Sequence, residues 1–389
     1  MARTLIIAYT TYLHDARVRR HAEALAARGH NVDVISIAGG EPARLAGVNL
    51  IGIITPRYRG SSRTRYLLAY CGFFARAAVI AMRRSLKQSY DVAITCSIPD
   101  AAVLAALPCR LFGTRIVLDV HDTMPEIYRD KFGGWRGTMG ERLLRFEERA
   151  SAALANHVLA VHEPHAERLV QAGIQSAKIT VVTNGPDPSI FAHRSIGAGN
   201  GGEFLLACHG TMSHRSGLDV ALDAFARLHP CLPNLRLLVI GGGDYYRTYQ
   251  EMAHQLGLDA VVTFRGLIPT DQIPAALGNV AVGLVPYRAT NATKLMLPVK
   301  LLEYASLGIP AVAPRLPAIQ YYFDESAVRY FEPGDVASLA AAIDELYHEP
   351  ARRKELAASA ARVVSKIGWS EQSSNFHRAI DAQLARQDV

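Results

Sequence analysis

Apolar runs and amphipathic stretches alternate along the whole of this 389-residue chain. The apolar run Thr4–Tyr9 is followed by Asp15–Gly29, in which Val18, Ala22 and Leu25 recur at helical spacing. Continuous apolar strands that are separated by helices predict parallel sheets covered on both faces. The further strands expected in the first half are Asn31–Ser36, Val92–Cys96, Arg115–Val120, His157–Val161 and Ile179–Val182.

A glycine-rich segment at 193–203 interrupts this pattern and is typical of a linker. A second alternating series follows it. Its expected strands are Phe204–Cys208, Leu235–Ile240, Val261–Arg265, Val280–Val285, Pro310–Ala313 and Val328–Phe331, and its expected helices are Leu218–Leu228, Tyr246–Leu256, Lys300–Leu307 and Val336–His348. The pattern predicts an α/β protein with two Rossmann-like domains, 1–192 and 204–367, facing a cleft, because ligands of open α/β sheets bind beyond the carboxyl ends of the strands.

Charge is distributed unevenly over the two halves. The net charge is +7 overall, but residues 1–195 carry 25 Lys and Arg against 16 Asp and Glu, a net of +9, and the remainder is close to neutral at −2. The first half is therefore expected to meet an anionic partner: a phosphorylated substrate, a membrane surface or nucleic acid. The five cysteines form no C-x-x-C pair, which favours reduced thiols in the cytoplasm over a disulfide or zinc framework.

Two features of the second half indicate an anionic ligand. Gly241–Gly243 follows an apolar strand and lacks the third glycine of a dinucleotide fingerprint, so it is either a tight turn or a ligand-binding loop. Pro298 is well placed to begin a helix in which Lys300 occupies the first turn. A lysine opposes the helix dipole there unless an anion binds at that end. Glu303, on the same helix face, could accept hydrogen bonds from a ribose, and the alternative is a solvated Lys–Glu pair.

Several segments, taken in order, resemble family-4 glycosyltransferases of the GT-B fold. They are YTTYLHDARVRRHAEALAARGHNVDVI, VHDTMPE, ITVVTNGPDPSIF, HGTMSHRSGLDVALDAFA, VTFRGLIP and LPVKLLEYASLGIPAVAPRLPAI. The resemblance covers nearly the whole chain and is greatest to proteins of bacterial surface-polysaccharide assembly. It implies a nucleotide-sugar donor on the second domain, an acceptor mainly on the first, retention of anomeric configuration, and neither a metal ion nor a cofactor. The C-terminal stretch 368–389 would pack back on the first domain.

The resemblance also assigns roles to single residues. Glu303 matches the ribose-binding second glutamate of an E-x7-E motif, whereas Leu295 occupies the place of the first glutamate. His121 matches a histidine beside the donor sugar. The family's phosphate-binding Arg and Lys are missing, and Arg215 and Lys300 are the expected replacements. The remaining residues expected around the donor are Gly210, Thr211, Gly242, Arg265, Leu267, Asn291 and Pro298, with Asn291, Thr293 or backbone amides before Pro298 as substitutes for the missing glutamate.

The expected acceptor side has four candidates, each with an alternative. Asp15 and Arg17 follow the first strand, where a ligand would lie, but Asp15 is also suited to cap the following helix. Asp122 either caps a turn or contacts the acceptor. Glu126 either begins a helix or serves as an acceptor-site carboxylate.

The segment 57–90 contains eight basic and no acidic residues around the apolar, aromatic-rich stretch Tyr66–Met82. It is either an interfacial membrane helix, with residues 57–87 meeting an anionic surface, or a helix buried against the sheet. No run of 18 apolar residues without charge is present, so no membrane span is expected. Nucleic acid is disfavoured because no recognised binding module occurs.

These observations predict a retaining glycosyltransferase that moves a sugar from a UDP- or GDP-sugar to a saccharide or lipid-linked saccharide. We expect it in the cytoplasm. If residues 57–87 bind an anionic surface, it would lie at the inner face of the cell membrane. The alternatives are a nucleotide-sugar epimerase of the same fold and a non-catalytic nucleotide-sugar-binding subunit.

Overall fold

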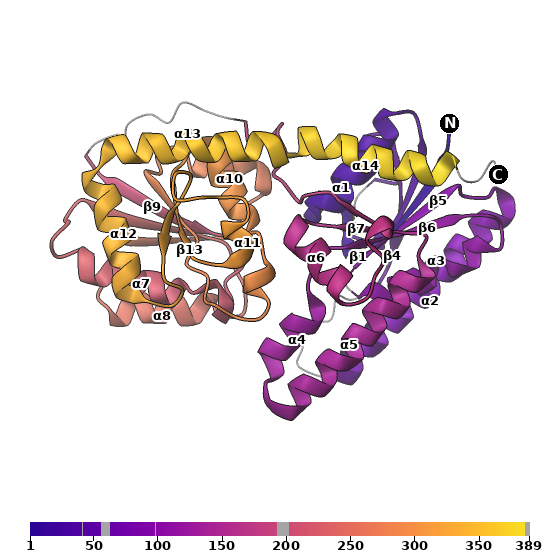
Figure 1. The fold of residues 1–389 in the computed structure, drawn as a ribbon, viewed down its shortest axis with the longest axis horizontal. Helices are drawn as coiled ribbons and strands as arrows, with labels where there is room; N and C mark the ends of the chain where they lie inside the picture. The colour runs from indigo at the N-terminus through magenta and orange to yellow at the C-terminus, as the bar shows by residue number, and fades with distance from the viewer. Residues whose placement is uncertain (41, 56–62, 98, 193–201, 386–389) are drawn as a thin grey trace. The chain divides into compact units, whose positions relative to one another are not determined.

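The computed structural model describes residues 1–40, 42–55, 63–97, 99–192 and 202–385. It divides into two compact units, which are Met1–Asn184 with Gln372–Val389 (unit 1) and Gly185–Glu371 (unit 2). Most of the glycine-rich segment 193–203 lies outside the described residues. Each unit contains one sheet with helices on both faces (Figure 1), so the predicted α/β class is confirmed.

The sheet of unit 1 has the strand order β3-β4-β2-β1-β5-β6-β7-β8, and all neighbours are parallel except β3 and β4. The strands are β1 (Arg3–Thr11), β2 (Asn31–Ile37), β3 (Arg44–Leu45), β4 (Val48–Ile53), β5 (Val92–Cys96), β6 (Arg115–Val120), β7 (His157–Ala160) and β8 (Ile179–Val181). The sequence pattern does not predict β4, because Asn49 and Gly52 interrupt its apolar run. Pairing with β2 along the whole strand defines it instead.

Seven helices of the described chain belong wholly or mostly to unit 1. They are α1 (Ala16–Ala27), α2 (Arg63–Lys87), α3 (Val103–Arg110), α4 (Met124–Phe132), α5 (Gly134–Leu154), α6 (Glu163–Gln171) and α14 (Trp369–Leu384). The core beneath α2, α3, α5 and α6 is one apolar cluster. Phe73, Ala77 and Ala81 of α2 lie in it, so one face of this helix packs against the sheet, as the buried-helix interpretation requires. Residues 57–62 lie outside the described residues.

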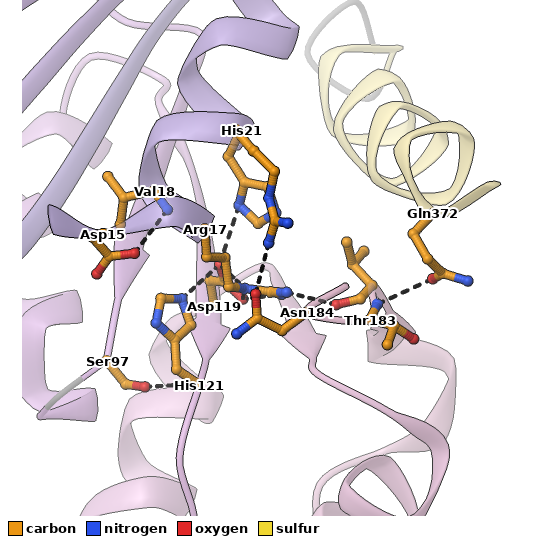
Figure 2. A network of polar contacts seen from close by, with 12 residues as sticks. Asp15, Arg17, Val18, His21, Ser97, Asp119, His121, Thr183, Asn184 and Gln372 are labelled. Carbon is orange, nitrogen blue, oxygen red and sulfur yellow. Dashed lines mark hydrogen bonds and ion pairs between the residues drawn. The ribbon is translucent and has the colours of Figure 1, made fainter. Parts of the chain in front are cut away.

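The C-terminal helix α14 is attached to unit 1 by both apolar and polar contacts. The ring of Phe376 stacks on His21 of α1, with 4.2 Å between the ring centroids. Gln372 Oε1 accepts a hydrogen bond from the backbone amide of Thr183 at 3.1 Å (Figure 2). Because Phe376 is fully buried, the sequence-distant helix is part of the folded core of this unit.

Unit 2 has the strand order β11-β10-β9-β12-β13-β14, and every pair is parallel. The strands are β9 (Phe204–His209), β10 (Leu235–Ile240), β11 (Val262–Gly266), β12 (Val282–Leu284), β13 (Ala311–Pro314) and β14 (Arg329–Phe331). This is the doubly wound order, in which the chain reverses direction across the sheet between β9 and β12. Ligands of such sheets bind at the carboxyl ends of the strands at that switch point.

Helices cover both faces of this sheet and bury two separate apolar clusters. They are α7 (Leu218–Leu228), α8 (Tyr246–Gln255), α9 (Ile273–Ala276), α10 (Val299–Leu307), α11 (Pro317–Gln320), α12 (Val336–His348) and α13 (Pro350–Ile367). Among the described residues of the whole chain, no helix combines the length and the apolarity that crossing a bilayer requires.

Candidate functional site

The loops that follow β9 and β10 meet at the switch point of unit 2, and glycines allow them to cross. A Cβ atom on Gly241 would lie 2.0 Å from the carbonyl oxygen of Gly210, and one on Gly243 would lie 2.4 Å from that of Met212. The amide of Met212 also donates to the carbonyl of Gly242 at 2.9 Å. Gly241 and Gly243 are therefore required by packing between two backbone segments, which supports the turn interpretation of this triplet.

Lys300 is a buried cation in the first turn of α10 and is only 7% exposed. Its Cε lies 3.3 Å from the place that a Cβ on Gly210 would take, so the side chain runs along the loop after β9. Burial by itself lowers the pKa of the ammonium, but Tyr287, Cys208 and Glu303 outweigh it and raise the pKa above its usual value.

No carboxylate of the described residues forms an ion pair with Lys300. A buried charge without a counter-ion is costly, and the amino end of a helix also attracts negative charge. The ammonium and the start of α10 together provide what a phosphate group requires.

Glu303 lies one turn further along α10. One of its carboxylate oxygens is hydrogen-bonded to a histidine, and the other can accept a hydrogen bond from a ligand. Its Oε2 lies 2.5 Å from Nε2 of His209, the last residue of β9. His209 Nδ1 lies 2.9 Å from the hydroxyl of Tyr304, which donates to the carbonyl of Ala207 at 2.9 Å. A carboxylate only accepts, so His209 Nε2 carries the hydrogen. Oε1 of Glu303 forms no hydrogen bond with any group that the structure describes.

Arg215 lies in the 3₁₀ turn His214–Ser216, whose backbone is held in place. Its carbonyl accepts a hydrogen bond from the amide of Arg288 at 3.1 Å. Gly217, which ends the turn with a φ of 64°, passes so close to Pro286 that a Cβ would lie 1.9 Å from the Pro286 oxygen. The Arg215 guanidinium is half-buried and has no ion-pair partner within the described parts of the chain. It is therefore the second cation available near the loop after β9.

Of the other residues expected around the donor, Arg265 lies near the end of β11, and the rest lie in loops that follow strands or precede α10. Thr211, Arg265 and Asn291 are exposed. Leu267 is 83% exposed, and a Cβ on Gly242 would lie 3.1 Å from its Cγ. Pro298 is buried and stands at the N-cap position of α10.

Thr293, one of the expected substitutes for the missing glutamate, is already engaged. It is fully buried, and its hydroxyl donates to the carbonyl of Arg288 at 2.6 Å. Asn291 is exposed, and Asn291 and the backbone before Pro298 stay the other expected substitutes.

In unit 1 the side chains after β1 and β6 converge on one buried carboxylate (Figure 2). Asp119 is fully buried and accepts from Arg17 through both oxygens, with Arg17 Nη2 2.7 Å from Oδ1 and Nε 3.0 Å from Oδ2. Arg17 Nη1 also donates to the carbonyl of Val182 at 2.7 Å. Arg17 is 3% exposed, so its guanidinium faces Asp119 and the backbone. Arg17 thus links three parts of the sheet: the helix after β1, where it lies, β6 through Asp119, and the segment after β8 through Val182.

Two histidines share the same carboxylate and have opposite pKa shifts. His121 Nε2 lies 2.9 Å from Asp119 Oδ2, and His21 Nδ1 lies 3.3 Å from the same oxygen. Burial alone lowers the pKa of His121, but Asp119 outweighs burial and raises it. For His21, burial and then Arg17 lower the pKa to about 4. His21 is therefore neutral at physiological pH, whereas the pKa of His121 lies above its usual value because of Asp119.

Cys96, Asp119 and His121 lie close enough together to be considered as metal ligands. Asp119 is already bound by Arg17 in two places, and a guanidinium beside a cation would repel it. Burial also raises the pKa of the Cys96 thiol well above its usual value, which opposes the thiolate form that binds metals. The chemistry of this donor set does not fit a metal ion.

The other acceptor-side candidates have local partners. Asp15 Oδ1 accepts from the amide of Val18 at 3.0 Å, so its predicted capping role is confirmed. Thr123, and not Asp122, stands at the N-cap position of α4, and Asp122 is half-buried beside it. Glu126 lies in the first turn of α4, as the helix-start alternative predicts.

The Glu126 carboxylate is 4% exposed, and its Oε1 lies 2.9 Å from both Arg168 Nε and Arg145 Nη2. Glu126 is therefore part of an internal ion pair with these two arginines. These contacts do not support a role for Glu126 in binding the acceptor.

Asp119 and His209 are among the residues of these clusters to which the sequence assigned no role. Each stands in the carboxyl-terminal part of a mostly apolar buried strand. A polar side chain at that position is the signal that could have revealed them, because buried polar groups need partners and the strand ends border the ligand sites.

Comparison with known sequences identifies the family. The sequence model of Glycosyltransferase Family 4 matches residues 16–190, and that of Glycosyl transferases group 1 matches residues 203–349. The chain belongs to the family-4 glycosyltransferases. The predicted family is thereby confirmed, and its two models match the two halves of the chain that the sequence pattern separated.

Individual relatives of this glycosyltransferase are distant. A GDP-mannose-dependent alpha-(1-6)-phosphatidylinositol monomannoside mannosyltransferase of Mycolicibacterium smegmatis is 29% identical over 43% of this chain and 44% of its own length. The putative colanic acid biosynthesis glycosyltransferase WcaL of Salmonella typhimurium is 27% identical over 48% and 47%. The chain thus spans about half the length of the curated relatives that it matches.

Solved structures share the fold over nearly the whole chain. Sucrose-phosphate synthase from Thermosynechococcus elongatus matches 99% of this chain and 100% of its own with a TM-score of 0.81 and 17% identity. Anabaena HepE, solved in complex with UDP and glucose, matches 97% and 99% with a TM-score of 0.73 and 15% identity. These likenesses confirm the GT-B fold of this glycosyltransferase.

Proposed function

We propose that this glycosyltransferase moves a sugar from a nucleotide-sugar donor bound by unit 2 to a saccharide or lipid-linked saccharide bound mainly by unit 1. The observation that carries the proposal is Lys300, a buried cation at the start of α10 beside the glycine loop after β9, which forms no ion pair with any carboxylate that the structure describes. A diphosphate supplies the missing negative charge there. GDP-mannose is the first donor to test, since the mycobacterial relatives are named as GDP-mannose-dependent, with UDP-sugars next.

Glu303 binds the ribose in this proposal, and His209 is a positioning residue. The imidazole of His209 fixes Oε2, so Oε1 is directed away from it and can accept from a ribose hydroxyl. Tyr304 in turn fixes the imidazole through its hydroxyl. A carboxylate held in one orientation before the ligand arrives loses little entropy on binding.

The proposed transfer retains configuration and proceeds on one face of the sugar. The bond from the anomeric carbon to the diphosphate oxygen breaks, and a bond from the same carbon to the acceptor oxygen forms. The leaving oxygen takes the acceptor's proton. Negative charge grows on the diphosphate as this happens, and Lys300, Arg215 and the start of α10 stabilise it without rearrangement. These fixed positive charges supply the charge stabilisation, so we propose no metal ion and no cofactor.

The acceptor side of the proposal rests on His121 and its neighbours in unit 1. Asp119 holds His121 by its Nε2 hydrogen, which fixes the ring that the family resemblance places beside the donor sugar. Arg17 acts through Asp119 and not on the ligand. A lipid-linked acceptor fits the relatives named for phosphatidylinositol mannosides. We accordingly place the protein at the cytoplasmic face of a membrane, with residues 57–87 as one contact with anionic lipid and with no role for nucleic acid.

Donor binding by purified variants tests this function. Lys300→Met removes the buried charge and should weaken GDP-mannose or UDP-sugar binding at least tenfold, measured by calorimetry and by thermal shift. Glu303→Gln and His209→Ala should each weaken binding by about five- to thirtyfold, which corresponds to the loss of one or two hydrogen bonds to a charged group. His209→Gln, which keeps a side-chain donor, should recover part of the affinity.

Lys354→Met is the matched control, because Lys354 is an exposed lysine of α13 in the same unit. It should bind donor as the unaltered chain does. If Lys300→Met binds the donor with unchanged affinity, Lys300 is not part of the donor site and the proposed assignment is wrong. Donor binding without any release of nucleoside diphosphate would favour the non-catalytic subunit, and conversion of the donor sugar without an acceptor would favour the epimerase.

A further inference from the structure

Helix α5 presents an exposed face made of apolar and arginine side chains only. Its exposed side chains are the small Ala153 near its end and the larger Trp135, Arg136, Met139, Arg142, Leu143, Phe146 and Arg149. At 3.6 residues per turn they cover an arc of about 140°. The four larger apolar side chains, 62% to 70% exposed, occupy about 80° in the middle of this arc. Arg136 stands at one edge, and Arg142 and Arg149 stand at the other.

The opposite side of α5 is fixed against unit 1, so the orientation of the exposed face is determined. Gly140 faces α4, where a Cβ would lie 2.0 Å from the ring of Tyr128. Ala152, near the end of α5, is buried in the apolar cluster beneath the helices. Figure 1 shows α4 and α5 side by side in unit 1, while the four larger apolar side chains named above stay 62% to 70% exposed. The exposed apolar side chains are therefore not covered by the helix that packs on α5.

None of the three acidic side chains of α5 is among its exposed residues, and each has a partner. Glu141 pairs with Arg145 at 2.8 Å. Glu147 accepts a hydrogen bond from the amide of Ala101, and Glu148 pairs with the buried Arg168. The charges that α5 exposes are consequently all positive. An apolar stripe with cations along both edges complements the boundary between acyl chains and anionic headgroups.

We propose that this face of α5 docks unit 1 on an anionic lipid bilayer, with Trp135, Met139, Leu143 and Phe146 inserted at the headgroup boundary. This goes beyond the proposed function, which assigns membrane contact only to residues 57–87. The two regions are connected, since α3 contacts both α2 and α5. The exposed residues of α2 beyond position 67 are also apolar or basic: Leu68, Cys71, Ala75, Arg76, Val79, Arg83, Leu86 and Lys87.

A bilayer fits this face better than a second copy of the chain does. In a twofold contact the same patch meets itself, which would bring arginines against arginines. Anionic lipids instead neutralise all three arginines at once, and each cation near such a surface adds to the attraction. An acidic protein partner would satisfy the arginines equally, and binding to protein-free vesicles is the result that distinguishes the bilayer from it.

Tryptophan fluorescence tests the inserted helix directly, because the chain contains two tryptophans, Trp135 and Trp369. In the Trp369→Phe variant, phosphatidylcholine vesicles with 30% phosphatidylglycerol should shift the emission of Trp135 to shorter wavelength. Brominated acyl chains should quench it. In Trp135→Phe, the remaining Trp369 should show neither effect. Pure phosphatidylcholine vesicles should bind at least tenfold more weakly, and salt should weaken binding to the anionic vesicles.

Variants of the two kinds of side chain separate the apolar and the electrostatic parts. Leu143→Gln with Phe146→Gln, and Arg142→Glu with Arg149→Glu, should each lower vesicle binding at least tenfold. Arg227→Glu with Arg362→Glu changes two exposed arginines of unit 2 by the same charge and should have no effect. Circular dichroism checks that each variant folds. If the variant with both apolar substitutions does not fold, the variant with both arginine substitutions still tests the proposal.

Three results would overturn the proposal. The first is vesicle binding that survives both α5 variants but is lost with Arg76→Glu and Arg83→Glu on α2. The second is a lipid-free dimer that Leu143→Gln with Phe146→Gln dissociates, which would assign the face to a second copy. The third is no binding to either kind of vesicle. All measurements are made without donor, so failure here leaves the proposed glycosyl transfer untouched and can be told apart from its failure.

Discussion

Buried polar side chains at the ends of apolar strands define the chemistry of both units. His209 ends β9 and holds Glu303, while Asp119 in β6 accepts from Arg17, which lies 102 positions earlier in the chain. Each of these groups would be costly to bury alone, and each is stabilised by its partner. Lys300 differs from them because no carboxylate of the described chain pairs with it. That difference is why we propose Lys300 as a binding group for an anion.

The pH dependence of unit 1 provides a test at the scale of one residue. The pKa of His21 falls from an ordinary 6.5 to about 4 in the fold, so the unfolded chain takes up a proton in this range and the folded chain does not. The free energy of unfolding should therefore decrease as the pH falls from 6.5 towards 4. The expected loss is on the order of 3 kcal/mol. Urea unfolding at several pH values measures it.

His21→Leu removes the titrating group and should reduce this acid-dependent loss of stability. The groups facing His21 are Arg17, Asp119 and His121, and Phe376 of α14 stacks on it. His121 does not offset the loss, because its raised pKa confers stability that is already complete below 6.5. His14→Asn, at an exposed histidine, should leave the dependence unchanged. An identical pH profile in His21→Leu would contradict the assignment.

At the scale of elements, the spacing of apolar residues predicts the bounds of those helices and strands that bury a continuous apolar run or face. The strands Val92–Cys96, Arg115–Val120 and Leu235–Ile240 and the helix Leu218–Leu228 begin and end where the apolar pattern predicts. They are buried on the expected faces, so sequence pattern and packing agree. The sequence pattern does not predict the hairpin of β3 and β4, since Asn49 and Gly52 interrupt the apolar run of β4, and pairing with β2 defines that strand.

The glycine triplet allows a prediction about one loop. Gly241→Ala places a Cβ against the backbone oxygen of Gly210 at a φ of 138°, and neither the backbone nor the oxygen can yield easily. We expect a loss of about 2 kcal/mol or more in stability. Gly242→Ala meets only the flexible side chain of Leu267 and should cost clearly less. Thermal unfolding of the two variants measures the difference, and equal losses would mean that the crossing of the loops does not require Gly241.

At the scale of the whole molecule, the charge asymmetry has a structural counterpart. The basic half, with its net charge of +9, contains α2 and α5, whose exposed faces carry arginines. The nearly neutral half contains one buried lysine among its described residues, beside the start of α10, where we propose that a diphosphate binds. In this proposal the excess charge serves surface contact in unit 1, while donor binding in unit 2 depends on the placement of a few cations.

Hydrogen exchange should separate the two units in solution. Addition of the preferred nucleotide sugar should slow exchange in the segments 209–217, 240–246 and 298–304 of unit 2, because a bound ligand opposes local opening. Anionic vesicles should instead slow exchange in α5. Mass spectrometry of peptides from both samples gives the comparison. Protection by the donor that is confined to residues 1–184 would reverse the proposed division of labour.

The sequence by itself determined the fold class, the family and the helix that carries Lys300 and Glu303. These follow from local periodicity and short motifs, which the chain order preserves. Only the tertiary structure decided which side chains are partners: Arg17 with Asp119, His209 with Glu303, and the open apolar face of α5. Such pairs join residues far apart in sequence, and the exposure of a helix face depends on the elements that pack against that helix. A local sequence pattern therefore predicts neither the pairs nor the exposed face.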